Sequence, residues 1–304
     1  MAAAGTVDGV SMLEELRPRA FAVAYRMLGS VSDAEDIVQE ALLRLHLKLE
    51  DGERIESPRA YIATVVTRLC IDQLRSARVR RERYVGDWLP EPLIDDGRTI
   101  DPADHAEMAD SMSLAFLVLL ESLTPEQRAA FLLREVFDYP YAEIAEIIST
   151  GEDNARQLVA RARRHVEAGR PRFETSEQRR DELASSFLAA VTDGDLQALE
   201  DLLADDVVLQ GDGGGRVRAI RRPVRGRTKV ARLLMKVMRD AEAFGGWRVR
   251  QVHVNGQPGA TVSDATGKLH GVLVLDIDTD GHISAVRSVV NPDKLGHIDG
   301  HASG

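Results

Sequence analysis

The chain has 304 residues but a single cysteine, Cys70, so it cannot form an internal disulfide. Its longest uninterrupted apolar run, residues 114–120, is far shorter than the ~20 residues that cross a bilayer. A basic start followed by an apolar stretch is also missing at the N-terminus, so we predict no signal peptide, no membrane association and a cytoplasmic location. The sequence shows neither metal-ligand spacing nor a glycine-rich nucleotide-binding motif, and we therefore expect no metal site and no cofactor.

The clearest positive signal is a helix-turn-helix pattern in residues 141–168. Apolar residues spaced by three and four predict one helix over 141–148 and another over 152–168, and Gly151 between them supplies the backbone freedom of a sharp turn. The sequence TPEQ at 124–127 predicts the capped start of a preceding helix. Such a domain displays its last helix to the DNA major groove. An ordinary helical hairpin with a solvated basic face is the alternative.

A second segment, residues 33–45, predicts a helix with an acidic face. Residues 33–43 contain four acids and no base. Acids in a first turn stabilise the positive end of the helix dipole, which accounts for Asp33, Glu35 and Asp36 but less well for Glu40, two turns further on. An acidic face of this kind suits a basic protein partner.

The next predicted helix has the opposite charge. Ser57 and Pro58 are suited to its N-cap and first position. Between Arg59 and Arg83 there are seven arginines and two acids, a net charge of +5 in a chain whose formal net charge is −10. A local basic patch on an acidic protein is typical of a phosphate-binding surface, although arginines also stabilise the C-terminal end of a helix.

These segments, with the sequences DAEDIVQEALLRL (33–45), SPRAYIATVVTRLCIDQLRS (57–76) and YAEIAEIIST…NARQLVARARRHV (141–166), resemble a bacterial sigma factor. The resemblance is to the extracytoplasmic-function (ECF) type, which has only regions 2 and 4. It implies a non-enzymatic protein, without catalytic residues, that binds RNA polymerase core, recognises the −35 and −10 promoter elements and directs transcription initiation. A stand-alone repressor or activator is the alternative, but it would need neither the acidic helix nor the second basic helix.

The resemblance also assigns residues to each contact. The acidic helix, similar to region 2.2, should dock on the clamp helices of the polymerase through Asp33, Glu35, Asp36, Gln39 and Glu40. The helix after Pro58, similar to regions 2.3–2.4, should contact the −10 element through Tyr61, Thr64, Thr67, Arg68, Arg75 and Arg78, with the loop 49–56 holding a flipped base. The helix-turn-helix, similar to region 4.2, should read the −35 element through Asp153, Asn154, Arg156, Gln157, Arg161 and Arg164, and its domain should dock on the polymerase flap.

The remaining sequence predicts a linker and a third domain. We divide the chain into a region 2 domain (8–83), an acidic proline-containing linker (84–108), a region 4 domain (109–168) and a C-terminal domain (178–304). The last should be an α+β domain with a curved antiparallel sheet wrapped on helices, and it resembles the SnoaL-like, NTF2-like cone. The fold class is therefore multidomain: two all-α sigma domains followed by an α+β cone.

Three short motifs resemble those of the ECF subgroup with a fused C-terminal domain: WLPEP (88–92), DGGGR (212–216) and NPDKL (291–295). They predict a regulatory intramolecular contact with the sigma body, so that no separate anti-sigma factor is required. The residues are Trp88, Asp212, Gly213, Gly214, Gly215, Arg216, Asn291, Pro292, Asp293, Lys294 and Leu295. By resemblance, the linker also crosses the active-site cleft and RNA-exit channel of the polymerase; otherwise it is a soluble spacer.

Alternatives remain for the C-terminal domain. It could sense a small molecule or be an enzyme, but no paired acid and base demands catalysis. Residues 214–239 carry ten cations and no acid. This basic surface could contact an acidic surface or upstream DNA, or it could be a solubilising face.

Overall fold

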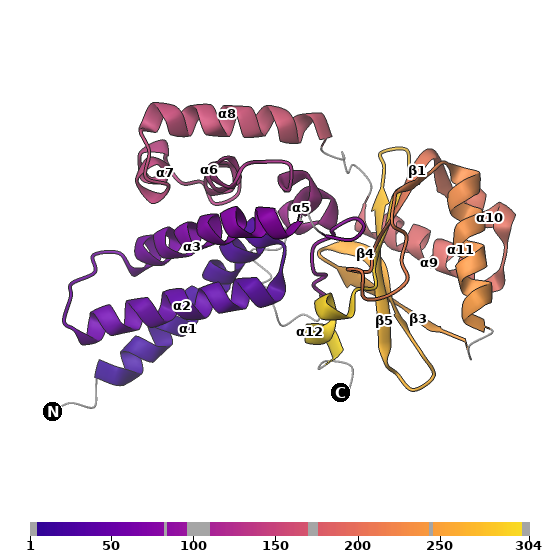
Figure 1. The fold of residues 1–304 in the computed structure, drawn as a ribbon, viewed down its shortest axis with the longest axis horizontal. Coiled ribbons are helices and arrows are strands. Elements are labelled where there is room, and N and C mark those ends of the chain that lie inside the picture. Colours follow the sequence, from indigo (N-terminus) through magenta and orange to yellow (C-terminus); the bar gives the residue numbers. More distant parts are fainter. Residues whose placement is uncertain (1–4, 82–83, 96–109, 170–175, 243–245, 300–304) are drawn as a thin grey trace. The chain divides into compact units, whose positions relative to one another are not determined.

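A computed structural model describes residues 5–81, 84–95, 110–169, 176–242 and 246–299 (Figure 1). They form two compact units. The first comprises residues 1–82, 99–111 and 116–170, and the second comprises residues 83–98, 112–115 and 171–304. The linker residues 84–95 thus belong to the C-terminal unit, although in sequence they lie between the two sigma domains.

The first unit begins with three packed helices, α1 (Gly5–Leu28), α2 (Val31–Glu50) and α3 (Pro58–Arg81). Helix α2 starts two residues before the predicted Asp33, because the Ser30 hydroxyl accepts a hydrogen bond from the Asp33 amide at 3.2 Å and caps the helix. Opposite the acidic face, an apolar stripe of α2 is buried: Ala34, Ile37, Val38, Ala41 and Leu45.

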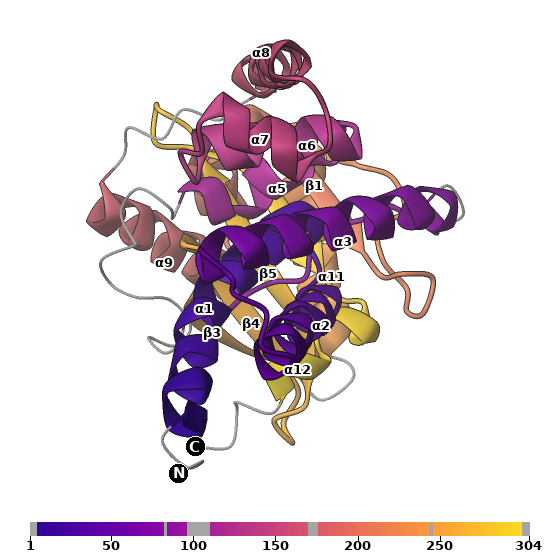
Figure 2. The same ribbon diagram turned by 90° about the vertical axis from the view of Figure 1, so that its left-hand side faces the viewer.

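The helix-turn-helix follows as α6 (Pro125–Glu135), α7 (Tyr141–Ile147) and α8 (Glu152–Gly169), after a short 3-10 helix (Asp110–Met112) and α5 (Leu114–Leu120). The predicted capping box is present, since Thr124 and Gln127 each bond the other's backbone amide. Leu133, Ile144 and Val159 join the three helices in one small core. Figure 2 shows α8 along the outer side of α6 and α7.

Among its described residues, the C-terminal unit contains a six-stranded sheet of order β2-β1-β6-β5-β4-β3, three longer helices and a short terminal helix. The helices are α9 (Glu177–Asp193), α10 (Leu196–Leu202) and α11 (Arg227–Glu242). The strands are β1 (Leu203–Asp212), β2 (Val224–Arg225), β3 (Arg248–Val254), β4 (Gln257–Ser263), β5 (Leu269–Ile277) and β6 (Ile283–Val289). A 3-10 turn (Pro292–Lys294) and α12 (Gly296–Asp299) end the described chain.

The sheet is mixed, so the expectation of a purely antiparallel sheet is wrong at one pair. Strands β1 and β6 run parallel, whereas the other neighbours are antiparallel. The parallel pair arises because the first long strand pairs with the last one, and that connection includes α11 and the antiparallel strands β3–β5. As a result, the DGGGR motif, which begins at the last residue of β1, and the NPDKL motif after β6 lie at the same end of these two strands.

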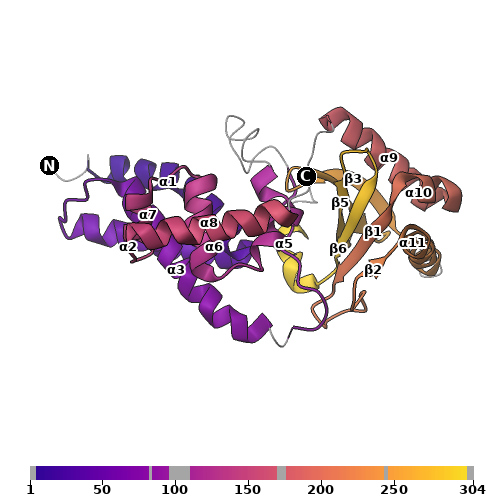
Figure 3. The same cartoon turned by 90° about the horizontal axis from the view of Figure 1, so that it is seen from above.

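Helices α9, α10 and α11 cover one face of this sheet (Figure 3). The core between them is apolar and includes Phe187, Leu199, Leu209, Val230 and Val286, all nearly inaccessible to solvent. Each such side chain contributes about 1.5–3 kcal/mol when fully buried, so this layer fixes the sheet that carries the two motifs. None of the described helices has the length and apolar character needed to cross a membrane.

Candidate functional site

The acidic face of α2 is mostly open to solvent. Its exposed members are Glu35, Asp36, Gln39 and Glu40. Asp33 is half-buried and accepts a hydrogen bond from Gln73 of α3 at 3.2 Å, so it also helps to position α2 on α3. Two cations pair with acids of this face: Arg17 of α1 lies 3.2 Å from Glu35, and Arg44 of α2 donates to Glu40 at 2.7 Å. Both are exposed pairs, which typically contribute 0–1 kcal/mol and are readily exchanged for other partners.

Two of the arginines predicted to contact the −10 element, Arg68 and Arg75, already have partners within the first unit. The Arg68 guanidinium donates to the carbonyls of Glu146 and Ile147, both at 2.9 Å, at the C-terminal end of α7. The Arg75 guanidinium forms an ion pair with Glu126 of α6 at 2.7 Å. Regions 2 and 4 are thereby held together, and DNA would have to displace these contacts.

One residue of the predicted −10 set is misplaced. Thr67 is fully buried, so its expected position on the DNA side is wrong in this structure. The reason is helical spacing: Thr67 lies four residues from both Ala63 and Ile71, which are buried on the same face of α3. Tyr61 and Thr64 are half-buried, and Arg78 lies where the side chains of α3 are outside the described residues.

The predicted DNA-reading face of α8 is solvent-exposed. Its members are Asp153, Asn154, Arg156, Gln157, Arg161 and Arg164. Near the start of the helix, Arg156 pairs with Glu152 and lies 4.4 Å from the centroid of the Tyr141 ring, and Asn154 donates to the Thr150 hydroxyl at 2.8 Å. These contacts hold both side chains in place near the start of α8.

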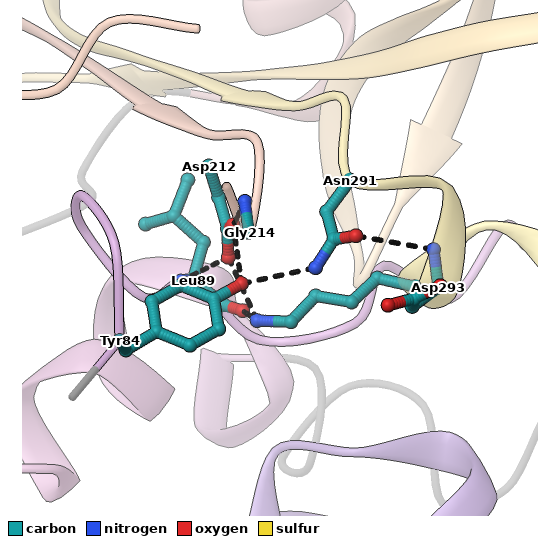
Figure 4. Close-up of polar contacts among 7 residues, drawn as sticks. Tyr84, Leu89, Asp212, Gly214, Asn291 and Asp293 are labelled. Carbon is teal, nitrogen blue, oxygen red and sulfur yellow. Dashed lines mark hydrogen bonds and ion pairs between the residues drawn. The ribbon is translucent and has the colours of Figure 1, made fainter. Parts of the chain in front are cut away.

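In the C-terminal unit, the buried carboxylate of Asp212 binds residues at the start of the linker (Figure 4). It accepts hydrogen bonds from the Tyr84 hydroxyl at 2.6 Å, the Leu89 amide at 2.8 Å and the Gly214 amide at 3.0 Å. It also forms an ion pair with the Lys294 ammonium at 2.7 Å. The carboxylate therefore joins residues from the linker, the DGGGR motif and the NPDKL motif.

Lys294 is the matching buried cation, with only 6% of its surface exposed. Its ammonium donates to the Leu89 carbonyl and lies 4.1 Å from the Trp88 ring centroid, a cation–π distance. Asn291 donates to the Tyr84 hydroxyl at 3.0 Å. Burial and the hydrogen bond to Asp212 raise the pKa of Tyr84, so the phenol stays protonated and keeps its donor role.

A second buried side chain, Asn255, holds the later part of the linker. Its amide oxygen accepts from the Leu93 amide at 2.9 Å, and its own backbone amide donates to the Leu93 carbonyl at 2.8 Å. Its side-chain nitrogen donates to the carbonyl of Met112 at 3.0 Å, in the 3-10 helix just beyond the linker. Ile94 then pairs with Val254 as an antiparallel bridge. We call Asp212, Asn255, Asn291 and Lys294 the linker clamp.

The glycines of the DGGGR motif are required by close packing. Gly214 has φ +58°, and a Cβ there would lie 2.3 Å from the Asn291 side chain. A Cβ on Gly213 would lie 2.6 Å from the Ala219 Cβ. Gly215, with φ +71°, packs against Val85 of the linker. The turn therefore fits between the clamp and residues 217–219 only without side chains.

Of the predicted regulatory residues, the structure joins Trp88, Asp212, Gly214, Asn291 and Lys294 at the linker. Arg216 and Asp293 form an exposed ion pair at 3.0 Å instead. Leu295 is buried and Pro292 is exposed, and both line a cavity.

Sequence reasoning missed Tyr84, Leu89 and Asn255. Asn255 and Gly256 form a turn, in which Asn255 has a φ of +54°. The local sequence pattern is that of a turn and carries no sign that the Asn255 side chain binds the linker. Across the described residues, no group of three or more His, Cys, Asp or Glu side chains is placed to hold a metal ion.

Comparison with known proteins agrees with this arrangement. Residues 12–80 match the family Sigma-70 region 2, residues 113–166 match Sigma-70, region 4, and residues 184–290 match the SnoaL-like domain. The ECF RNA polymerase sigma factor SigJ of Mycobacterium tuberculosis is 38% identical over 299 residues, covering 94% of this chain and 93% of that protein. SigG of the same organism is 30% identical over 298 residues, 88% of this chain and 77% of that protein.

The crystal structure of M. tuberculosis SigJ superposes with a TM-score of 0.75 at 36% identity, covering 94% of this chain and 98% of that chain. The similarity thus extends through both sigma regions and the C-terminal domain, in the same order. This confirms the resemblance and the fold class predicted from the sequence. The chain belongs to the ECF RNA polymerase sigma factors that carry a C-terminal SnoaL-like domain.

Proposed function

We propose that the C-terminal domain regulates this sigma factor by holding the linker that joins regions 2 and 4. The observation that carries the proposal is the buried Asp212–Lys294 ion pair, which lies directly on the linker backbone at Leu89. Removing one partner of a buried pair typically costs about 3–5 kcal/mol, because the other charge is left uncompensated. The contacts that this pair makes with the linker are charge-assisted hydrogen bonds to the Leu89 amide and carbonyl, which typically contribute about 1.5–3 kcal/mol each and can restrain the linker without a separate anti-sigma factor.

The clamp holds the linker at both ends. Asp212 and Lys294 hold its first part, and Asn255 bonds both Leu93 and Met112. Region 2 ends where the clamped segment begins, and region 4 starts just after Met112. Release of the clamp would therefore free the connection that sets how far apart regions 2 and 4 can move.

Promoter binding requires such a separation. The −35 and −10 elements lie about 25 base pairs apart, or ~85 Å at ~3.4 Å per base pair. Helix α3 has 24 residues and is ~36 Å long at ~1.5 Å per residue. While Arg68 and Arg75 bind α7 and α6, α3 and α8 cannot engage both elements. The closed first unit is thus the inactive form in this proposal.

In the open form, each surface has one role. The exposed acids of α2 bind the clamp helices of polymerase core, and region 4 docks on the flap. The freed arginines of α3 contact the −10 element, and the loop 49–56 holds a flipped base. Residues near the start of α8 read −35 bases, whereas Arg161 and Arg164 contact phosphates. The C-terminal domain acts through binding and not through catalysis.

Two truncations test the regulatory role in a purified transcription system. Deleting residues 291–304 removes Asn291 and Lys294 from the clamp, and we expect transcription to rise. Cutting the chain after residue 170 removes the whole C-terminal domain, and transcription should fall if other parts of that domain assist polymerase binding. If neither cut changes transcription, the domain does not regulate this sigma factor and the proposal is wrong.

A further inference from the structure

The C-terminal domain encloses a cavity of about 450 Å³ that the linker clamp does not use. Helices α9 and α11 and the concave face of the sheet form its walls, with Phe187, Leu209, Leu234 and Leu273 among the lining side chains. Small-molecule sites typically measure about 300–1,000 Å³ and are mainly apolar with a few polar groups. This cavity has the size and the lining of such a site.

The rim of the cavity is apolar and exposed. Val217, Val237 and Trp247 all border it, although 42%, 37% and 37% of their surfaces are open to solvent. Apolar side chains gathered at one opening indicate a surface that a ligand covers. Exposed apolar side chains scattered over the domain would not indicate a binding site.

The charged side chains that border the cavity are Arg218 and Lys268, both basic, and His270 lies on the same border. The described lining contains no aspartate or glutamate. Asp264, outside the lining, accepts a hydrogen bond from His270 at 2.9 Å. Hydrogen bonds from Thr266 and His270 lower the pKa of Asp264, so it remains ionised behind the histidine. An apolar interior with a cationic rim fits a hydrophobic anion.

One wall of the cavity is shared with the linker clamp. Pro292 and Leu295 line the cavity, and Asn291 and Lys294, which alternate with them along the chain, hold the linker. In the turn that follows β1, Gly213 packs directly on Ala219, another lining residue. A molecule that fills the cavity therefore presses on the same segments that form the clamp.

We propose that this cavity binds a hydrophobic carboxylate, with its hydrocarbon part inside and its anionic group at Arg218 and Lys268, and that binding alters the clamp. The binding site stands on the cavity alone. The effect on the clamp rests on the function proposed above, because it assumes that holding the linker matters.

The two tryptophans of the chain report the two sites separately. Trp247 borders the cavity, and Trp88 lies in the clamp against Lys294. In the full-length Trp88→Phe variant, decanoate below its micelle concentration should change Trp247 fluorescence in a saturable way. Decanol should bind about tenfold more weakly, which corresponds to ~1.4 kcal/mol, and decyltrimethylammonium more weakly still. No saturable change with decanoate overturns the site, and equal binding of the three overturns its anion preference.

Variants localise the binding. Arg218→Gln with Lys268→Gln should weaken decanoate about tenfold without changing decanol, and both side chains are exposed, so folding is not at risk. Ser288→Phe places a ring in the cavity and should abolish binding of both probes. Ala189→Phe adds the same ring at an exposed position of α9 and should have no effect. Unchanged decanoate affinity in the rim variant would contradict the assignment.

The full-length Trp247→Phe variant tests the connection between the sites. Decanoate should change Trp88 fluorescence with the same midpoint as it changes Trp247 in the other variant. A silent Trp88 with a saturated Trp247 would disprove the effect on the clamp. If truncation of the clamp changes transcription while decanoate does not bind, this inference fails and the proposed function stands.

Discussion

Replacing Asp212 with asparagine is the sharpest perturbation of the linker clamp. Asparagine has nearly the same shape but a single side-chain oxygen. With that oxygen at the Oδ2 position it still accepts from the Leu89 amide and the Lys294 ammonium, whereas its NH2 group faces the Tyr84 hydroxyl, which can accept, and the Gly214 amide, which loses its acceptor. The Lys294 ammonium, only 6% exposed, also loses its counter-ion. The substitution therefore removes the buried charge while keeping the hydrogen bond to the linker backbone at Leu89.

The magnitude follows from burial. Breaking one partner of a buried pair costs about 3–5 kcal/mol, against 0–1 kcal/mol for an exposed pair. The interaction of Lys294 with the Trp88 ring and the Leu89 carbonyl remains, which places the expected loss near ~3 kcal/mol. At ~1.4 kcal/mol per factor of ten, the linker should open about a hundredfold more often.

Native-state hydrogen exchange at the Leu89 amide measures this opening, because that amide donates to Asp212 itself. Its exchange should accelerate about a hundredfold in Asp212→Asn, and core amides such as that of Phe187 should be followed in parallel to separate clamp opening from unfolding of the domain.

The matched control is Asp293→Asn in the adjacent motif, which breaks an ion pair with Arg216 whose side chains are 65% and 59% exposed. It should accelerate Leu89 exchange less than about fivefold, in line with an exposed pair. If Asp212→Asn changed Leu89 exchange no more than this control does, the clamp would not depend on its buried charge and the reasoning would be refuted.

Four further results are expected. Charge reversal of Asp36 and Glu40 to lysine should abolish association with polymerase core in a pull-down while the circular dichroism spectrum stays unchanged; retained affinity would contradict the role of α2. In promoter-binding titrations, Gln157→Ala should cost ~1–3 kcal/mol and relax specificity at one −35 position. Arg161→Ala should instead weaken all sequences alike and flatten the salt dependence, and a changed sequence preference would show that its side chain reads a base. Because burial and its hydrogen bond raise the pKa of Tyr84, the closed clamp retains the phenolic proton better than the open linker; the resulting stability is present below about pH 10 and lost above it. Trp88 fluorescence should show this loss of stability, and the Tyr84→Phe variant should lack the part that comes from Tyr84. Identical pH profiles for the unmodified protein and this variant would contradict the prediction.

Local patterns predicted the helices because caps and apolar spacing act over a few residues. Thr124 with Gln127 and the apolar stripe of α2 are examples, and both are present in the structure. The same reasoning misplaced Thr67, because a threonine on α3 gives no sign of whether it faces solvent or the buried stripe. The parallel pairing of β1 with β6 was likewise invisible, since strand order depends on contacts between segments far apart in sequence.

The regulatory motifs were identified by resemblance, but their physical role was not predictable from the sequence. Tyr84 meets Asp212 across 128 positions, and Leu93 meets Asn255 across 162. Polar pairs in loops carry no periodicity that would place them together. The linker itself, acidic and rich in proline, was equally consistent with a free spacer. A buried aspartate and lysine become meaningful only once the fold brings both to the linker.

An engineered, reducible disulfide between the linker and the C-terminal domain tests most directly whether the linker must leave the clamp for transcription. Ile94 and Val254 form a non-hydrogen-bonded antiparallel pair, because the flanking bonds run from the Asp95 amide to His253 and from the Asn255 amide to Leu93. Such pairs have Cα atoms ~4.5 Å apart, within the ~4.4–6.8 Å range of disulfides. Cysteines at 94 and 254 should therefore cross-link, and the buried Cys70, whose thiol pKa is raised by burial, should not interfere.

The measurement is purified transcription by the Ile94→Cys/Val254→Cys protein before and after reduction, with each single cysteine variant as control. Holding the linker on the C-terminal domain should suppress transcription in the oxidised protein, and reduction should restore it to the level of the single variants. Equal transcription by the oxidised and reduced double variant would show that the linker need not leave the clamp, and would contradict the account.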